Sequence, residues 1–178
     1  MAEPIPEKPI PLAPKKVKFI VVHHSATPRD KTTFEAIKKY HTEVFKFWDI
    51  GYHWVILGDS TLKQGRSEEY IGAHAKGVNF ESVGVCVVGN FEIEQPTRQQ
   101  LETLELVLNQ LMRKYGISPA NVIGHRDVAN TLCPGKNLYE WLKEWKKRQI
   151  VNNPNYLDEV INLLKEALKR LEEFKKSL

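Results

Sequence analysis

The chain has 178 residues, of which 42% are hydrophobic and 27% charged, and this composition suits one folded domain with a hydrophobic core and a small appendage. Its formal net charge of +4 serves general solubility or attracts an anionic partner, either nucleic acid or the acidic polymers of a cell envelope. The sequence has no stretch of dense Lys and Arg interleaved with aromatic residues, and no apolar run near the roughly 20 residues of a membrane helix, so we expect neither nucleic-acid binding nor membrane insertion.

The first segment, residues 1–16, predicts an extended, proline-rich arm. It contains five prolines and lacks the apolar core of a signal peptide. We therefore expect the chain to be made and kept in a cytoplasm until another factor releases it.

The next stretch predicts a strand, a helix and a hairpin in that order. Residues 17–24, VKFIVVHH, are apolar and β-branched, as in a strand buried on both faces. Thr32 and Glu35 have the spacing of a helix capping box. The helix that follows has one stripe of residues on a single face: Phe34, Ile37, Lys38 and His41. Residues 52–65 predict a hairpin whose turn is the sequence GDS.

A second strand and a long helix follow a polar, glycine-rich loop. The apolar residues 83–90, VGVCVVGN, predict a central strand. Thr97 and Gln100 form a second capping box, and the helix it opens runs through Tyr115 to a C-terminal glycine, Gly116. Four leucines lie on the inner face of this helix: Leu101, Leu104, Leu108 and Leu111.

The remaining elements complete the predicted fold class. Residues 121–125, NVIGH, predict a short strand that ends in His125, and residues 137–148 predict a third amphipathic helix. Strands that alternate with helices are typical of an α/β fold. We expect a single domain over residues 17–150, with a central mixed β-sheet flanked by helices on both faces.

Residues 151–178 predict a separate C-terminal amphipathic helix. Apolar residues recur at helical spacing: Leu157, Val160 or Ile161, Leu164, Leu168, Leu171 and Phe174. The stripe indicates a helix that packs on the domain or pairs with a second copy of itself. A contact with a cell envelope or another protein is the alternative.

Three metal-ligating residue types lie at the ends of predicted elements. They are His23 or His24, His125 and Cys133. Two imidazoles and a thiolate suit Zn²⁺, and three protein ligands leave a fourth position for water, as in catalytic zinc sites. Adjacent strand residues point to opposite faces, so only one of His23 and His24 can reach a metal from a regular strand. Ordinary core or surface positions are the alternative for each, and we expect Cys86 to lie in the core.

Four motifs, in this order and at this spacing, resemble those of the type-2 N-acetylmuramoyl-L-alanine amidases. They are HHSAT, IGYHWVI, GAHAKGVNFESVGVCVVGN and GHRDVANTLCPG, and the resemblance covers roughly residues 17–145. This superfamily includes phage endolysins and the animal peptidoglycan-recognition proteins. The resemblance implies that His23, His125 and Cys133 bind Zn²⁺.

The resemblance also implies catalytic roles for two further residues. Tyr52 matches the family's catalytic tyrosine, whose phenol donates a hydrogen bond to an oxyanion or orients the attacking water. Thr131 matches a position where some phage members have a lysine and amidase-active recognition proteins a threonine. A threonine hydroxyl can donate a hydrogen bond there but cannot supply a positive charge.

Two more sets of residues are predicted to surround this site. His74, Asn79 and Ser82 match family positions in the loop that lines the substrate groove, although a polar surface loop is the alternative. Arg126 and Asp127 are expected to orient His125, because they follow it directly in the sequence.

The expected reaction is zinc-dependent hydrolysis of the amide bond between N-acetylmuramic acid and L-alanine in peptidoglycan. A chain without a signal peptide is most like a phage endolysin, which stays in the host cytoplasm until it is released to act on the cell wall. Three alternatives remain: a non-catalytic peptidoglycan-binding module, a bacterial cytoplasmic enzyme of wall recycling, and a regulator that acts through protein contact. The presence of Cys133 disfavours the binding module, since lineages that only bind usually lack this ligand.

Overall fold

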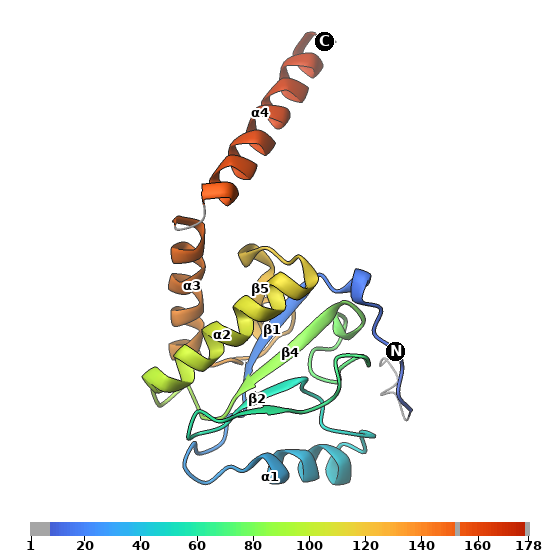
Figure 1. The fold of residues 1–178 in the computed structure, drawn as a ribbon, viewed down its shortest axis with the longest axis vertical. Helices are drawn as coiled ribbons and strands as arrows, with labels where there is room; N and C mark the ends of the chain where they lie inside the picture. Colours follow the sequence, from blue (N-terminus) through green and yellow to red (C-terminus); the bar gives the residue numbers. More distant parts are fainter. Residues whose placement is uncertain (1–7, 152–153, 177–178) are drawn as a thin grey trace. The chain divides into compact units, whose positions relative to one another are not determined.

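A computed structural model describes residues 8–151 and 154–176 of the chain (Figure 1). The chain divides into two compact units, Met1–Leu142 and Lys143–Leu178, and each unit is described by itself. The first unit contains all five strands.

The first unit is built on one five-stranded mixed sheet. Its strands are β1 (Phe19–His24), β2 (Trp54–Ile56), β3 (Leu62–Gln64), β4 (Ser82–Val87) and β5 (Val122–Gly124). Their order across the sheet is β3-β2-β4-β1-β5. Only the β2–β3 hairpin is antiparallel, and the other neighbouring pairs are parallel. The sheet confirms the predicted α/β class. β4 is its central strand, and β1, buried from Ile20 to His24, lies between β4 and β5.

Helices cover both faces of this sheet. α1 (Phe34–Lys39) lies on one side and α2 (Arg98–Tyr115) on the other (Figure 1). α1 runs on into a π-helical turn, Tyr40–Val44, and α3 (Lys136–Val151) follows β5. Short 3-10 turns complete the unit at Pro14–Lys16, Asn79–Glu81, Pro119–Asn121 and His125–Asp127.

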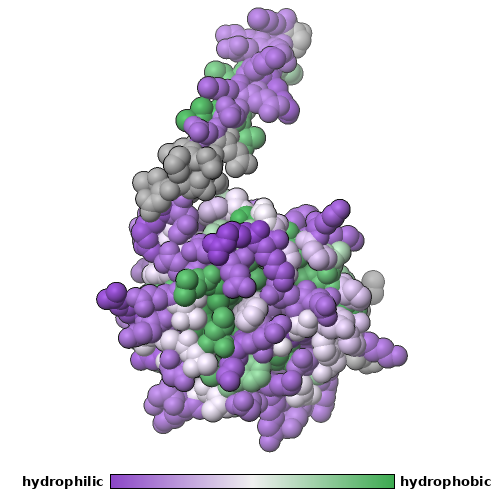
Figure 2. Space-filling view, viewed as in Figure 1, coloured by the Kyte–Doolittle hydropathy of each residue, from purple (hydrophilic) through white to green (hydrophobic). Residues whose placement is uncertain are grey.

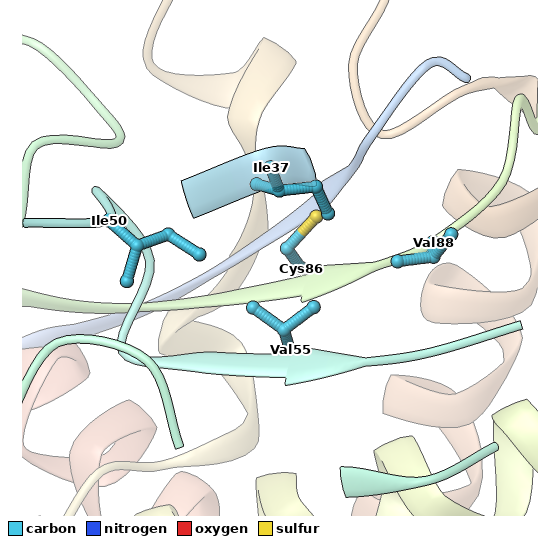
Figure 3. Close-up of a cluster of buried hydrophobic side chains, with 5 residues drawn as sticks. All are labelled: Ile37, Ile50, Val55, Cys86 and Val88. Carbon is cyan, nitrogen blue, oxygen red and sulfur yellow. The ribbon is translucent and has the colours of Figure 1, made fainter. Parts of the chain in front are cut away.

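The core lies on both faces of the sheet. On the α1 side, a cluster of buried side chains joins helix, loop and strands: Ile37, Ile50, Val55, Cys86 and Val88 (Figure 3). The prediction that Cys86 lies in the core is confirmed, because its side chain is fully buried. From α2, the buried apolar residues are Leu104, Val107, Leu108 and Leu111, while Leu101 is half-buried.

The two predicted capping boxes have different outcomes. At α2 the box is present, because the Gln100 N–H donates to Thr97 Oγ1 and the Thr97 N–H donates to Gln100 Oε1. The prediction of a capping box at Thr32 is wrong. Thr33 caps α1 and accepts the Ala36 N–H, whereas the Thr32 hydroxyl is held 2.8 Å from the carbonyl oxygen of Pro28 in the preceding turn.

The described part of the proline-rich arm pairs with a loop of the first unit. The Leu12 N–H donates to the Glu69 carbonyl and the Ile71 N–H to the Ile10 carbonyl, both at 2.8 Å. Leu12 is only 3% exposed. Residues 10–12 are therefore fixed against the loop at 69–71, while residues 1–7 lie outside the described chain.

The second unit contains α4 (Pro154–Lys176). Its apolar side chains are between 45% and 65% exposed: Ile161, Leu163, Leu164, Leu168, Leu171 and Phe174. Figure 2 shows hydrophobic residues among hydrophilic ones along this helix. The predicted stripe is thus present on α4, and the side chain of Leu157 lies outside the described residues. Among the described residues, no helix is long and apolar enough to cross a membrane.

Candidate metal centre

The candidate metal centre lies where two neighbouring parallel strands end. His23 is the penultimate residue of β1, and His125 directly follows β5, the parallel neighbour of β1. Because parallel strands end at the same edge of a sheet, the two imidazoles meet there, with ring centroids 4.5 Å apart. Cys133 completes the group, and one donor atom from each residue lies within 4.8 Å of the others.

Strand alternation separates the two adjacent histidines. His23 faces the same side of the sheet as Cys86, its register partner on β4. His24 has its own partners, since its Nδ1 accepts the Phe91 N–H at 3.2 Å and its ring lies beside that of Phe91. His23 is thus the histidine of β1 that lies with His125 and Cys133, and His24 packs nearby.

The loop that carries Cys133 is closed by backbone and side-chain hydrogen bonds. The Arg126 N–H donates to the Cys133 carbonyl at 2.8 Å, and the Arg126 guanidinium donates to the Leu132 carbonyl and pairs with Glu92 at 3.0 Å. The sulfur of Cys133 in turn accepts the backbone N–H of His24 at 3.4 Å. These contacts bring the thiol back to the end of β1.

Arg126 and Asp127 therefore support the loop and not the ring of His125. Asp127 accepts the Gly124 N–H at 2.8 Å and the Tyr139 hydroxyl at 2.5 Å, which fixes the turn that begins at His125. The described hydrogen bonds of both side chains lead to the end of β5, to loop atoms and to Tyr139 of α3. None of these described bonds reaches the His125 ring, so the expectation that the two side chains orient it stays a prediction.

The protonation states of the three donors suit a divalent cation. Burial lowers the pKa of His23 and of His125, so both imidazoles are neutral at pH 7 and have a lone pair to offer. Burial raises the pKa of Cys133 to about 12, although the His24 N–H and Arg126 act in the opposite direction. A bound divalent cation favours the thiolate, so metal binding at this site releases a proton.

The separation of the donors also fits zinc. A tetrahedral ion at about 2.3 Å from sulfur and about 2.0 Å from nitrogen would hold these two atoms roughly 3.5 Å apart. Cys133 Sγ lies 3.7 Å from His23 Nδ1. The donor types and this distance together fit Zn²⁺.

Tyr52 lies beside the three donors. Its ring centroid is 5.1 Å from that of His23, and its ring packs against the α1-side core cluster. Burial raises the pKa of the phenol well above its usual value, and the nearby thiols of Cys86 and Cys133 raise it further. Tyr52 therefore keeps its proton at neutral pH and can act as a hydrogen-bond donor, and its hydroxyl is hydrogen-bonded with the thiol of Cys86.

Thr131 lies on the same turn as Cys133. Its Oγ1 accepts the backbone N–H of Cys133 at 3.2 Å. This bond uses a lone pair of the hydroxyl and leaves its hydrogen available for donation. The side chain is half-buried.

The three residues expected to line the groove meet one another behind His23. His74 Nδ1 lies 3.0 Å from His23 Nε2, and Asn79 Oδ1 accepts the backbone N–H of His74 at 3.0 Å. Ser82 is fully buried, and its hydroxyl donates to the Val78 carbonyl. Contact with a substrate stays a prediction for all three residues, of which Asn79 is half-buried and His74 and Ser82 are buried.

Two supporting residues were missed by sequence reasoning. Arg66 is 1% exposed and donates to the carbonyls of Asp49, Ile50 and Ile71, which clamps the loop before Tyr52 to the loop before His74. His41 accepts the Gly51 N–H at 2.9 Å and its ring lies 5.2 Å from that of Tyr52. The sequence has 26 Lys and Arg residues, and nothing in it marks Arg66 as the buried one.

Comparisons with known proteins agree with this fold. The family model described as N-acetylmuramoyl-L-alanine amidase matches residues 13–136. The endolysin of Enterobacteria phage T3 is 37% identical over 141 residues, which span 75% of this chain and 89% of the endolysin.

Two solved structures show the same architecture. The N-acetylmuramoyl-L-alanine amidase LysC from Clostridium intestinale superposes with a TM-score of 0.68 at 36% identity, over 76% of this chain and 89% of LysC. A complex of the peptidoglycan-recognition proteins LCa and LCx with tracheal cytotoxin gives a TM-score of 0.69 at 27% identity, over 80% of this chain and 90% of the matched chain.

Proposed function

Because the chain belongs to the N-acetylmuramoyl-L-alanine amidase family, we propose that it is a zinc-dependent endolysin that hydrolyses the bond between N-acetylmuramic acid and L-alanine in peptidoglycan. The observation that carries this proposal is the convergence of His23, His125 and Cys133, whose donor atoms lie within 4.8 Å of one another. Tyr52 beside them adds a protonated phenol.

The residues of the site have distinct tasks in this reaction. His23, His125 and Cys133 would hold Zn²⁺, which when bound supplies a Lewis acid that activates water and polarises a carbonyl oxygen. Tyr52 donates a hydrogen bond to the oxygen of the attacked carbonyl as negative charge develops on it. Thr131 offers a second donor from the turn of Cys133. Removal of one donor of this kind typically lowers the rate by about 10²- to 10³-fold.

The phenol is suited to this task because it is fixed before the substrate arrives. The Tyr52 ring is held by the core cluster and by His41, and Arg66 clamps the loop that precedes it. A donor that is already oriented needs no reorganisation during the reaction, and its hydrogen bond strengthens in the transition state because negative charge grows on the oxygen that accepts it.

The test measures zinc content and the release of new L-alanine amino termini from purified peptidoglycan. We expect about one zinc per chain in wild type, Cys133→Ser without zinc or hydrolysis, and Tyr52→Phe with zinc but with hydrolysis lowered about 10²- to 10³-fold. Chelation should abolish hydrolysis and added Zn²⁺ should restore it. Unchanged hydrolysis by zinc-free Cys133→Ser would refute the mechanism, and wall binding without hydrolysis would indicate a binding module.

The cellular role is tested by the choice of substrate. An endolysin made in the host cytoplasm acts on the intact wall after release, and the net charge of +4 favours docking on anionic wall polymers. We therefore expect faster hydrolysis of insoluble walls than of soluble muropeptides at equal bond concentration. The opposite preference would indicate an enzyme of wall recycling.

A further inference from the structure

We propose that His74 is a positioning residue that holds His23 in the one tautomer able to bind the metal. This inference rests on the proposed metal centre, because it concerns how one of its three ligands is presented. It assigns His74, together with Ser82, to the support of the metal site instead of the substrate groove.

The two ring nitrogens of His23 face different partners. Nδ1 points toward the metal centre, 3.7 Å from Cys133 Sγ, and Nε2 lies 3.0 Å from His74 Nδ1. A neutral imidazole has one N–H donor and one lone pair. His23 can offer the lone pair of Nδ1 to a metal only when its proton is on Nε2, where His74 must accept it.

The direction of the hydrogen bonds beyond His74 is set by a backbone carbonyl. His74 Nε2 lies 3.5 Å from Ser82 Oγ, and the Ser82 hydroxyl donates to the Val78 carbonyl at 2.7 Å. A carbonyl oxygen can only accept. The Ser82 hydroxyl therefore donates its proton to the Val78 carbonyl and can only accept a hydrogen bond from His74 Nε2. With its proton on Nε2, His74 has a lone pair on Nδ1 that can accept the proton of His23. The His74 ring also hydrogen-bonds the backbone of Ser82, and the side-chain path ends at the Val78 carbonyl, which can only accept.

The ring of His74 is confined to this position. Asn79 Oδ1 accepts the backbone N–H groups of His74 and Ala75 at 3.0 and 2.9 Å, which fixes the start of the loop. The imidazole lies in a slot between two glycines. A Cβ at Gly72 would lie 2.3 Å from His74 Cδ2, and a Cβ at Gly84 would lie 2.5 Å from His74 Cγ. His74 is 9% exposed, so a direct contact with a polymeric substrate is a poor explanation of its placement.

A matched pair of substitutions separates the acceptor from the shape of the ring. In His74→Asn, Oδ1 takes the place of Nδ1 and can still accept the proton of His23. In His74→Leu, a side chain of nearly the same shape has no acceptor. Loss of such a partner typically weakens metal binding about 10- to 100-fold. We expect that loss for His74→Leu, and affinity within a few-fold of wild type for His74→Asn.

The measurement is the affinity for Zn²⁺ in competition with a chromophoric chelator at fixed pH, on the full-length chain. Co²⁺ serves as a second probe, because its absorption reports the geometry of the ligands. Equal zinc affinities and unchanged Co²⁺ spectra for wild type and both variants would overturn the inference. A loss of affinity in the leucine variant that asparagine restores would establish it.

The wild-type protein provides a test that does not depend on how the variants fold. Nitrogen-15 NMR of the zinc-loaded chain should show the proton of His23 on Nε2 and that of His74 on Nε2. A His23 proton on Nδ1 would overturn the inference. The proposed function fails separately, since a wild-type chain that binds no zinc and cleaves no wall contradicts the metal centre itself.

Discussion

Substitution of Gly84 by alanine should destabilise the protein by colliding with the ring of His74. Carbon atoms in contact lie about 3.5–4.0 Å apart, whereas a Cβ at Gly84 would lie 2.5 Å from Cγ and 2.6 Å from Cδ2 of His74. The overlap of roughly 1 Å falls on a ring that the opposite glycine also confines, so the ring cannot move aside freely. Overpacking of this kind costs about 1–3 kcal/mol.

A double-mutant cycle isolates that collision. The free energy of unfolding is measured by urea denaturation, in EDTA to remove any contribution of metal binding, for wild type, Gly84→Ala, His74→Ala and the double variant. His74→Ala opens the space that the new methyl group needs, so Gly84→Ala should then be close to neutral. We expect a coupling of about 1–3 kcal/mol, as found for residues in direct contact. If the two effects add, the imidazole does not lie over Gly84 and the placement of His74 is wrong.

Three further predictions concern acid stability, helix capping and association. Burial lowers the pKa of His53 from 6.5 to about 4. Between these pH values the unfolded chain binds a proton at His53 that the folded protein does not bind. The free energy of unfolding therefore falls by as much as about 3 kcal/mol as the pH drops from 6.5 toward 4. The variant His53→Asn keeps an acceptor for the Gly84 N–H. Its free energy of unfolding, measured with urea between these pH values, should depend less on pH than that of wild type. An unchanged pH dependence would show that His53 is not the group responsible. Thr97→Ala should lower the free energy of unfolding by about 1 kcal/mol, whereas Thr97→Ser should keep most of the stabilisation that the cap provides. Equal free energies of unfolding for wild type and Thr97→Ala would show that the cap contributes nothing. If α4 pairs with a second copy, the molar mass of wild type measured by light scattering should rise with protein concentration. The control variant Lys169→Asp should behave like wild type, whereas Leu168→Asp, which places a charge on the apolar stripe, should stay monomeric. A monomeric wild type would refute the pairing.

Elements with strong local patterns were predictable from the sequence. The apolar, β-branched residues of β1 and β4 have the composition of buried strands, and the α2 helix carries its capping residues within its first turn. A glycine with φ of 66° ends α2, as expected for a residue that must adopt the left-handed conformation. The capping partners of α2 lie only a few residues apart, and the apolar composition of each strand is local even though β1 and β4 pair across a long stretch of chain.

The prediction at Thr32 failed because two neighbouring threonines offer the same chemistry. Thr32 has the correct spacing to Glu35, but its hydroxyl bonds back to Pro28, and the helix begins one residue later with Thr33 as its cap. The choice between adjacent caps depends on the path of the preceding turn, which no local pattern specifies.

The sequence by itself determined which atoms could hold a metal, since the motifs and the strand ends together selected His23, His125 and Cys133, and strand alternation separated His23 from His24. The tertiary structure decided how those atoms are presented. His23 and His74 are 51 residues apart, and their hydrogen bond exists only because the loop of His74 folds over Gly84 on the strand beside β1. The proton of an imidazole follows the partner that each nitrogen meets in space, and that partner is fixed by long-range packing and not by neighbours along the chain.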